Sequence, residues 1–290
     1  MESMEIIKLL NSHDGKTIKY LQRTEDDNII ETGYYDLDEY VICISSQIGC
    51  SMNCVFCSTA APLDSQRPNL KFIRNLTSGE IVRQVKNVLN LLDENNLSRK
   101  RILFSYMGMG EPFLNYDNVM ESIRALSQDY PGSRATIATL GTKAGLIRKS
   151  AHNKFNVLLK IHLSLHAPND ELRRRILPKA ENIDNALEAL RYFSLTRNTP
   201  CKVNYILIKD INDSKVQAIQ LAKLLRNYPF TVKLSNLNNF NQLESSTLDK
   251  FELFEDILNS YDIETCRFFS TGTEIQAGCG QLRRHYYNKK

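Results

Sequence analysis

Apolar residues recur along this 290-residue chain with two different spacings. Between Ile81 and Leu92 they return every three or four positions, which is typical of a helix with one buried face. The segment RILFSY, Arg101–Tyr106, is a short and nearly continuous apolar run, which favours a buried strand. The two patterns then alternate as far as Phe268, so the sequence predicts strands that are separated by helices.

The further predicted elements are a helix from Asp117, a strand near 135–139, a helix near Ala144, a strand over 157–165, a helix around Asn169, a strand over 202–207, a helix over 214–225, a strand over 231–234, a helix over 248–258 and a strand over 263–268. Strands separated in this way form parallel βαβ units, and about six units make a partial barrel. We therefore expect an α/β fold, a partial (β/α)6 barrel of TIM type. Its chemistry would lie at the carboxyl ends of the strands, where the turns GMGEP, ATLGT, SLHAPND and LSNLNNF fall.

The chain is expected to divide into a β-rich lead-in over residues 1–40 and a core over residues 41–290. The lead-in contains the turn signal DGKT, and the core ends with a candidate catalytic loop and the basic tail RRHYYNKK. Hydrophobic residues make up 42% of the chain, without an apolar run long enough to cross a bilayer. The N-terminus lacks the order of a secretory signal, so we expect a cytoplasmic protein with no membrane partner.

The net charge and the cysteine content limit the possible partners of the chain and the possible roles of its cysteines. The net charge of +4 permits a nucleic-acid partner without implying one. The seven cysteines do not form an even secretory framework, so they indicate metal ligands or reactive thiols in a reducing compartment. Two of them, Cys201 and Cys266, fall in predicted strands and are expected in the core.

The segment GCSMNCVFC brings Cys50, Cys54 and Cys57 together with the spacing C-x-x-x-C-x-x-C. Three thiolates this close suit one compact metal centre. Structural zinc normally takes four ligands, whereas a 4Fe–4S cluster held by three cysteines leaves one iron open to a cofactor or substrate. A small structural metal site and a chance grouping are the alternatives.

This spacing, with an aromatic residue before the third cysteine, resembles the radical S-adenosylmethionine superfamily. The longer strings CISSQIGCSMNCVFCSTA, RNLTSGEI, MGMGEP, SLHAPNDELR, IND and AGCGQL are similar to the RlmN/Cfr family of RNA methyl synthases, which act on carbon 2 or carbon 8 of adenine. These strings keep their order from about Asp14 to Leu282. The resemblance implies a 4Fe–4S cluster and S-adenosylmethionine, which binds the open iron.

The resemblance also implies residues that hold the cofactor. They match the family's motifs at Gly110, Glu111, Ser164, Leu165, His166 and Asn238. A carboxylate suits the ammonium of the cofactor, because a charge-assisted hydrogen bond orients it. Taken alone, a serine, histidine or asparagine would more often be a cap or a satisfied core residue.

Two further cysteines match catalytic positions of the family. The resemblance implies that Cys279 is methylated by one S-adenosylmethionine, and that a 5′-deoxyadenosyl radical from a second removes hydrogen from that methyl. The methylene radical then adds to adenine, Cys43 resolves the protein–RNA adduct, and Glu31 accepts the proton; a disulfide bond is an expected feature. Read without the family, Cys43 would be a small buried hydrophobe and Cys279 an inert loop thiol.

The implied partners are ribosomal or transfer RNA and an electron donor such as flavodoxin or ferredoxin. The sequence departs from the family's usual pattern at three places. The helical RNA-binding domain ahead of the lead-in is expected to be missing. Ala138 replaces a cofactor-site serine, and residues 58–73 are expected to form a loop insertion. Arg173, Arg174 and Arg175 and the basic tail are candidate RNA contacts, with a solvated helix face and a disordered terminus as the alternatives.

Three functions remain open from the residues. The first is radical methylation of an adenine carbon in RNA, with carbon 2 preferred over carbon 8. The second keeps the methylcysteine chemistry but acts on a small molecule or peptide. The third is an iron–sulfur or zinc module without catalysis.

Overall fold

The computed structural model of the chain describes residues 4–59, 72–92, 100–238, 240 and 242–288. Most of the expected loop insertion over 58–73 lies outside the described residues. The described chain forms one ten-stranded sheet in the order β1-β2-β3-β4-β7-β8-β9-β10-β11-β12 and a two-stranded sheet of β5 and β6. None of the helices in these ranges has the length and apolar character needed to cross a membrane.

The first part of the large sheet is antiparallel. Its strands are β1 Met4–Asn11, β2 Thr17–Thr24, β3 Ile29–Asp36 and β4 Tyr40–Cys43. The small sheet pairs β5 Gln47–Gly49 with β6 Phe72–Asn75 on either side of the cysteine segment. The N-terminal strands therefore extend the same sheet that carries the rest of the chain, and the boundary at residue 40 stays a prediction.

The second part of the large sheet is parallel from β4 to β12. Its strands are β7 Ile102–Tyr106, β8 Arg134–Thr139, β9 Leu158–Ser164, β10 Lys202–Leu207, β11 Thr231–Asn236 and β12 Thr265–Phe268. Parallel strands need crossover connections, and here the crossovers carry the helices. This arrangement confirms the expected α/β fold.

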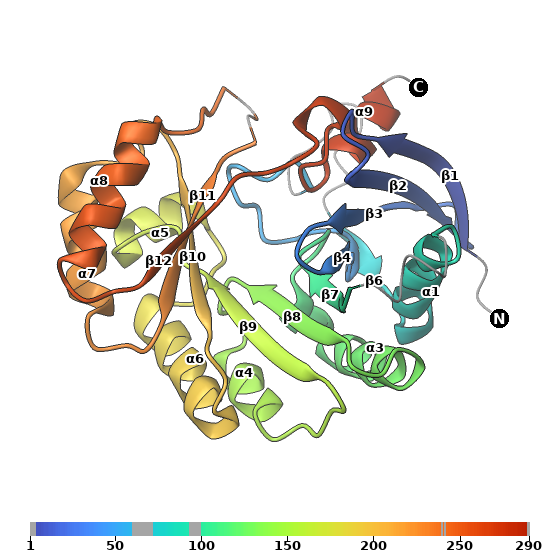
Figure 1. The fold of residues 1–290 in the computed structure, drawn as a ribbon, viewed down its shortest axis with the longest axis horizontal. Coiled ribbons are helices and arrows are strands. Elements are labelled where there is room, and N and C mark those ends of the chain that lie inside the picture. Colours follow the sequence, from blue (N-terminus) through green and yellow to red (C-terminus); the bar gives the residue numbers. More distant parts are fainter. Residues whose placement is uncertain (1–3, 60–71, 93–99, 239, 241, 289–290) are drawn as a thin grey trace.

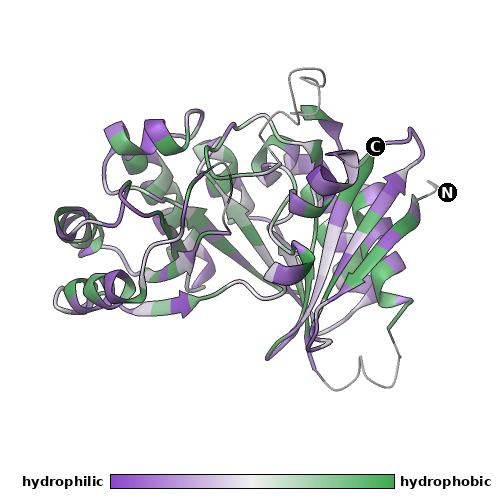
Figure 2. Cartoon of the chain, turned by 90° about the horizontal axis from the view of Figure 1, so that it is seen from above, coloured by the Kyte–Doolittle hydropathy of each residue, from purple (hydrophilic) through white to green (hydrophobic). Residues whose placement is uncertain are grey.

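The helices are α1 Ser78–Leu89, α3 Tyr116–Asp129, α4 Ala144–Ser150, α5 Asp170–Ile176, α6 Ile183–Arg197, α7 Lys215–Leu225, α8 Leu248–Asn259 and α9 Gln281–Asn288. Two short 3-10 turns lie at Pro112–Asn115 and Thr273–Ile275. Figure 1 shows α3, α4, α6, α7 and α8 around the outer side of the curved sheet. Each helix carries both hydrophobic and hydrophilic residues in Figure 2, as a helix with one buried face must.

Local chemistry sets where these elements begin. Helix α1 starts three residues before the apolar pattern, because Thr77 and Glu80 form a capping box at its N-terminus. Helix α7 has the same device in Ser214 and Gln217. Each capping box satisfies backbone N–H groups that the first turn leaves without partners.

The C-terminal segment returns to the start of the chain. After β12 it crosses the molecule, and α9 packs on the N-terminal strands (Figure 1). Leu282 of α9 lies in a buried apolar cluster with Leu21 and Ile29. This crossing takes the chain from β12, at one edge of the large sheet, to the N-terminal strands at the other end, and the candidate loop around Cys279 lies along it.

Candidate active site

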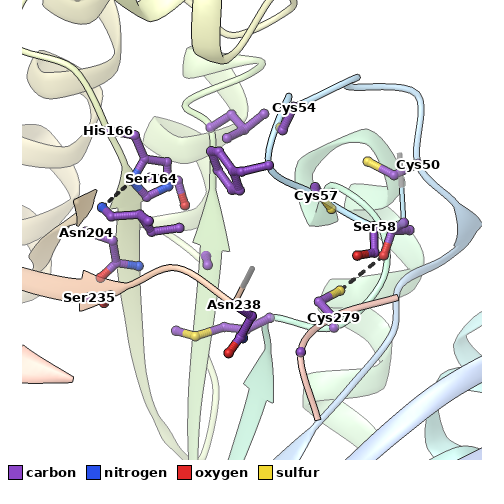
Figure 3. A pocket seen from close by; sticks show the side chains of 18 of the residues that line it. Cys50, Cys54, Cys57, Ser58, Ser164, His166, Asn204, Ser235, Asn238 and Cys279 are labelled. Carbon is purple, nitrogen blue, oxygen red and sulfur yellow. Dashed lines mark hydrogen bonds between the residues drawn. The ribbon is translucent and has the colours of Figure 1, made fainter. Parts of the chain in front are cut away.

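A cavity of about 300 Å³ lies at the carboxyl ends of the parallel strands. Nine of the residues expected in the site line it: Cys50, Cys54, Cys57, Gly110, Glu111, Ser164, His166, Asn238 and Cys279. Figure 3 shows the cysteine segment on one side of the cavity, with Ser164, His166 and Asn204 on the opposite side. The fold therefore brings together motifs that are more than two hundred residues apart in the chain.

The three clustered cysteines lie on one short segment and line the same cavity. Burial raises the pKa of the Cys50 thiol to about 12, and the neighbouring Cys57 adds to the effect. Burial is also the main reason that the pKa of Cys54 is raised, and the nearby Cys57 and Cys50 raise it further. Mutual repulsion of buried thiolates is the situation that a bound cation relieves. Phe56 of the same segment lines the cavity and packs edge-on against His166, 5.2 Å between ring centroids.

The turn after β7 places a carboxylate at the cavity wall. Gly110 has φ +105°, and a Cβ there would lie 2.7 Å from the Gln47 side chain, so the turn requires glycine. The Glu111 carboxylate accepts hydrogen bonds from Thr139 Oγ1 at 2.6 Å and from the Leu140 N–H at 2.9 Å. Burial nevertheless raises the pKa of Glu111 to about 7, because these hydrogen bonds offset only part of the desolvation.

In the SLH turn at the end of β9, Ser164 and His166 line the cavity, whereas Leu165 lies in the core. His166 adopts φ +56°, and its Nδ1 accepts the Ile206 N–H at 3.0 Å. Burial, followed by Arg173, lowers the pKa of His166 to about 3, so the ring is neutral with its hydrogen on Nε2. Leu165 is fully buried in the apolar core and does not line the cavity. The cofactor contact from Leu165 stays a prediction, which its backbone rather than its buried side chain would have to fulfil.

Some lining groups have no partner within the described residues. The side-chain oxygens of Asn238 and Asn204 are buried, and neither has a hydrogen-bond partner there. Buried polar atoms without partners are uncommon in native proteins. Three adjacent thiols, a buried carboxylate and unpaired amide oxygens fit a 4Fe–4S cluster with S-adenosylmethionine. Among the described residues no three His, Cys, Asp or Glu side chains are arranged to hold a single metal ion.

Cys279 lies in the same cavity, next to the cysteine segment. Its Sγ is 3.2 Å from Thr59 Oγ1 (Figure 3). A hydrogen bond with the Cys57 thiol, followed by burial, raises the pKa of Cys279. Gly280 follows with φ +79°, and a Cβ at this glycine would clash with the backbone and side chain of Thr59. The close approach of this loop to the cysteine segment therefore depends on a glycine after Cys279.

Glu31 anchors the Cys279 loop from the N-terminal sheet. Its carboxylate accepts the Gly280 N–H at 2.9 Å and the Arg283 N–H at 2.6 Å. Lys19 Nζ forms a buried ion pair with the same carboxylate, 2.8 Å from Glu31 Oε2. Burial pushes the pKa of Lys19 down, but the attraction of Glu31 outweighs it and the pKa is raised overall. Sequence reasoning misses Lys19, because nothing in a strand pattern marks the partner of a buried lysine.

Cys43 lies beside this ion pair rather than in the cavity lining. It pairs in register with Gly33 of β3, which pairs with Lys19 of β2, so the three occupy one row of the sheet. Burial raises the pKa of Cys43, although the nearby Lys19 lowers part of that effect. Tyr35 connects this row to the loop, because its hydroxyl donates to the Ala277 carbonyl at 3.3 Å. No disulfide joins any of the seven cysteines, all of which lie in the described part of the chain.

Several expected roles change in the structure. Arg173 is buried and donates to the carbonyls of Leu165, Leu140, Ser164 and Glu181, so it is structural and does not contact RNA. Arg174 and Arg175 are exposed.

The C-terminal tail and one of the two cysteines expected in the core also differ from the sequence-based expectations. The tail is helical to Asn288, where the alternative was a disordered terminus. Cys201 is buried as expected, but Cys266 is only half-buried and lies 3.4 Å from the Lys202 ammonium. Strand alternation explains the difference, because Cys266 points to the inner face of the sheet.

Comparisons with known proteins agree with this geometry. The family model for the Radical SAM superfamily matches residues 44–222. A Listeria welshimeri protein named "Probable dual-specificity RNA methyltransferase RlmN" is 37% identical over 98% of this chain and 77% of its own length. A Nautilia profundicola protein named "Dual-specificity RNA methyltransferase RlmN" is 36% identical over 97% of this chain and 78% of its own length.

Solved structures give the same result. The crystal structure of a radical SAM methyltransferase from Sphaerobacter thermophilus has a TM-score of 0.86 and 33% identity, and covers 97% of this chain and 81% of that chain. Streptococcus suis SuiB bound to S-adenosylmethionine has a TM-score of 0.54 and 16% identity, over 79% of this chain and 47% of that chain. The second likeness concerns the fold alone.

Proposed function

Because the chain belongs to the radical SAM superfamily and, within it, to the RlmN family, we propose that it methylates an adenine carbon in ribosomal or transfer RNA. We place the methyl on carbon 2, with carbon 8 as the alternative outcome of nucleoside analysis. The superfamily uses a 4Fe–4S cluster and S-adenosylmethionine. When bound, these groups supply a methyl group and the one-electron chemistry that an electron-poor ring carbon requires.

The lining residues have separate tasks in this proposal. Cys50, Cys54 and Cys57 would hold the cluster, since they are adjacent and their buried thiolates repel one another. Glu111 would hold the cofactor's ammonium with a carboxylate that Thr139 already orients. Ser164, His166 and Asn238 would contact the rest of the cofactor from the facing wall. The electron would come from a donor such as flavodoxin or ferredoxin, and the reaction would take place in the cytoplasm.

The position of Cys279 is the observation that carries the proposal. Cys279 lies on a separate loop beside the cysteine segment, where Thr59 and Gly280 hold it, and a further buried thiol, Cys43, lies in the adjoining strand. An electron carrier or zinc module would not need both of these cysteines in addition to the cluster ligands. We propose that the Cys279 sulfur carries the methyl group before it reaches the adenine, and that Cys43 resolves the protein–RNA adduct. Glu31 would hold the loop in place in this state, because its carboxylate accepts two of the loop's N–H groups.

Mass spectrometry of the C-terminal peptide tests this assignment. Protein reconstituted without oxygen and supplied with S-adenosylmethionine is expected to carry one methyl on Cys279. The Cys279→Ala variant should carry none at this peptide and should leave RNA unmethylated. The Cys201→Ala variant is the matched control, because Cys201 is buried in the core away from the cavity. Persistent absence of methyl from Cys279 in active protein would contradict the proposal.

A further inference from the structure

The inner face of β9, β10 and β11 carries a set of polar side chains beside the cofactor cavity. Parallel register places Lys202 of β10 next to His162 of β9. Two positions further along the strands, Asn204 lies between Ser164 of β9 and Lys233 of β11. Residues two apart in a strand share a face. Ser164, Asn204 and Lys233 line the cofactor cavity, so all five residues face inward.

This inner face is positively charged. Lys160, Lys202 and Lys233 all lie close enough to His162 to affect its titration. Within the described residues, none of these lysines forms a salt bridge with a carboxylate. Lys233 Nζ instead lies 3.9 Å from the centroid of the Phe268 ring. Burial lowers the pKa of Lys233, Cys266 offsets part of this effect, and Lys202 lowers the pKa further. Lys202 Nζ itself donates to Cys266 Sγ at 3.4 Å.

Two hydrogen-bonding groups at the same place have no partner in the described chain. His162 Nδ1 and Asn204 Oδ1 are both buried and unpaired there. Burial, followed by the three lysines, lowers the pKa of His162 to about 3, so the ring is neutral and one of its nitrogens is a donor. An N–H donor of this neutral ring between ammonium groups can bind an anion, whereas the Asn204 oxygen only accepts hydrogen bonds and suits a donor group of the cofactor.

The cofactor does not meet this requirement. S-adenosylmethionine carries a sulfonium and an ammonium against a single carboxylate, so its net charge is positive. A lysine-rich wall repels the remaining positive charge. The wall therefore suits a second, anionic molecule that binds beside the cofactor, where the substrate of a methyltransferase must lie.

We propose that Lys202 and Lys233, with His162, bind a phosphate group of the RNA nucleotide that is methylated. The inference rests on the proposed function for the source of the phosphate, whereas the anion site itself rests on the geometry of the inner face. Lysine binds phosphate as a point charge, and this contact fixes position without reading base identity. The site would hold the target nucleotide against the cavity that contains Cys279.

The test compares three charge variants of the holoenzyme. Lys202→Gln/Lys233→Gln removes both charges from the inner face, and Lys202→Arg/Lys233→Arg keeps them. Lys215→Gln/Lys223→Gln removes the same charge from exposed positions of α7. Binding of a labelled single-stranded RNA is measured by fluorescence anisotropy over a salt series, and circular dichroism checks that each variant is folded. The single variant Lys202→Gln replaces the double variant if that does not fold.

The inner-face Gln variant is expected to weaken RNA binding about tenfold at low salt and to reduce the salt slope by about 0.7 for each lost phosphate contact. The Arg variant should keep most of the affinity, and the α7 variant should bind like wild type. An unchanged affinity and slope in the inner-face Gln variant would overturn the phosphate site.

A calorimetric comparison of adenosine 5′-monophosphate with adenosine separates the two claims. Wild-type holoenzyme should bind the nucleotide more tightly than the nucleoside, and the inner-face Gln variant should lose that difference. If wild type binds no RNA but keeps this preference, the RNA function is wrong and the phosphate site stands, with a small nucleotide as its ligand. If wild type binds RNA without any such preference, the phosphate site is wrong and the RNA function stands.

Discussion

Glu111 is the buried group whose charge depends most directly on pH near neutrality. The cost of burying its carboxylate exceeds the gain from its hydrogen bonds, and its pKa therefore rises to about 7. An ammonium placed against it would reverse this balance, because an opposite charge lowers the pKa of a carboxyl group. The residue therefore links cofactor binding to pH.

The free energy of unfolding of the cofactor-free protein should depend on pH because of the raised pKa of Glu111. The folded pKa of Glu111 lies above its ordinary value of 4.5, so the folded chain binds more protons than the unfolded chain between about pH 4.5 and 7. The free energy of unfolding should consequently fall by about 3 kcal/mol from this group as the pH rises through that window. Urea denaturation at several pH values measures the slope for wild type and for Glu111→Gln. Equal slopes in the two proteins would contradict the raised pKa.

The loop that carries Cys279 depends on a glycine at a position of close contact. Gly280→Ala should displace the loop, because positive φ and a clash with Thr59 oppose the new Cβ. A cost of about 1–2 kcal/mol for the backbone alone would lower methylation of Cys279 about tenfold. Gly132→Ala is the matched control, since Gly132 also has positive φ but nothing lies within 4 Å of its added Cβ. Equal losses in the two variants would show that backbone strain, rather than contact with Thr59, is responsible.

Most helices and strands were predictable from spacing, because their buried faces are strongly apolar. Strand β10 has the expected bounds, and β11 extends two residues further than expected. Helix α6 is absent from the predicted elements, since alanine and serine on its buried face weaken the apolar pattern. Cofactor motifs were readable from the family resemblance, but Lys19 and the lysines of the inner face were not. Their roles depend on strand register, which brings distant residues into contact and is not encoded in local spacing.

At the scale of the whole molecule, a buried ion pair between β2 and β3 joins the N-terminal strands to the C-terminal loop at the active site. Lys19 and Glu31 connect these strands to the C-terminal loop through Gly280 and Arg283. The N-terminal strands therefore complete the site as well as extending the sheet.

Removal of one partner of this pair should be costly. Lys19→Met leaves the Glu31 carboxylate buried without its counter-ion, and unfolding free energy should fall by about 3–5 kcal/mol. Lys209→Met breaks the exposed pair with Glu244 and should leave the unfolding free energy nearly unchanged, because solvent screens this pair. Urea denaturation compares these variants with the double variant Lys19→Met/Glu31→Gln, which should recover part of the loss. A Lys19→Met protein as stable as the Lys209→Met control would show that the pair does not hold the loop.

Nucleoside analysis of RNA tests the central assignment most directly. RNA from cells that lack the gene is incubated without oxygen with the reconstituted protein, S-adenosylmethionine and a reductant, then digested and examined by mass spectrometry. Wild-type protein is expected to produce a carbon-methylated adenosine, and Cys279→Ala to produce none. RNA that gains no methyladenosine from wild-type protein with an intact cluster, or gains it equally from Cys279→Ala, would contradict the account.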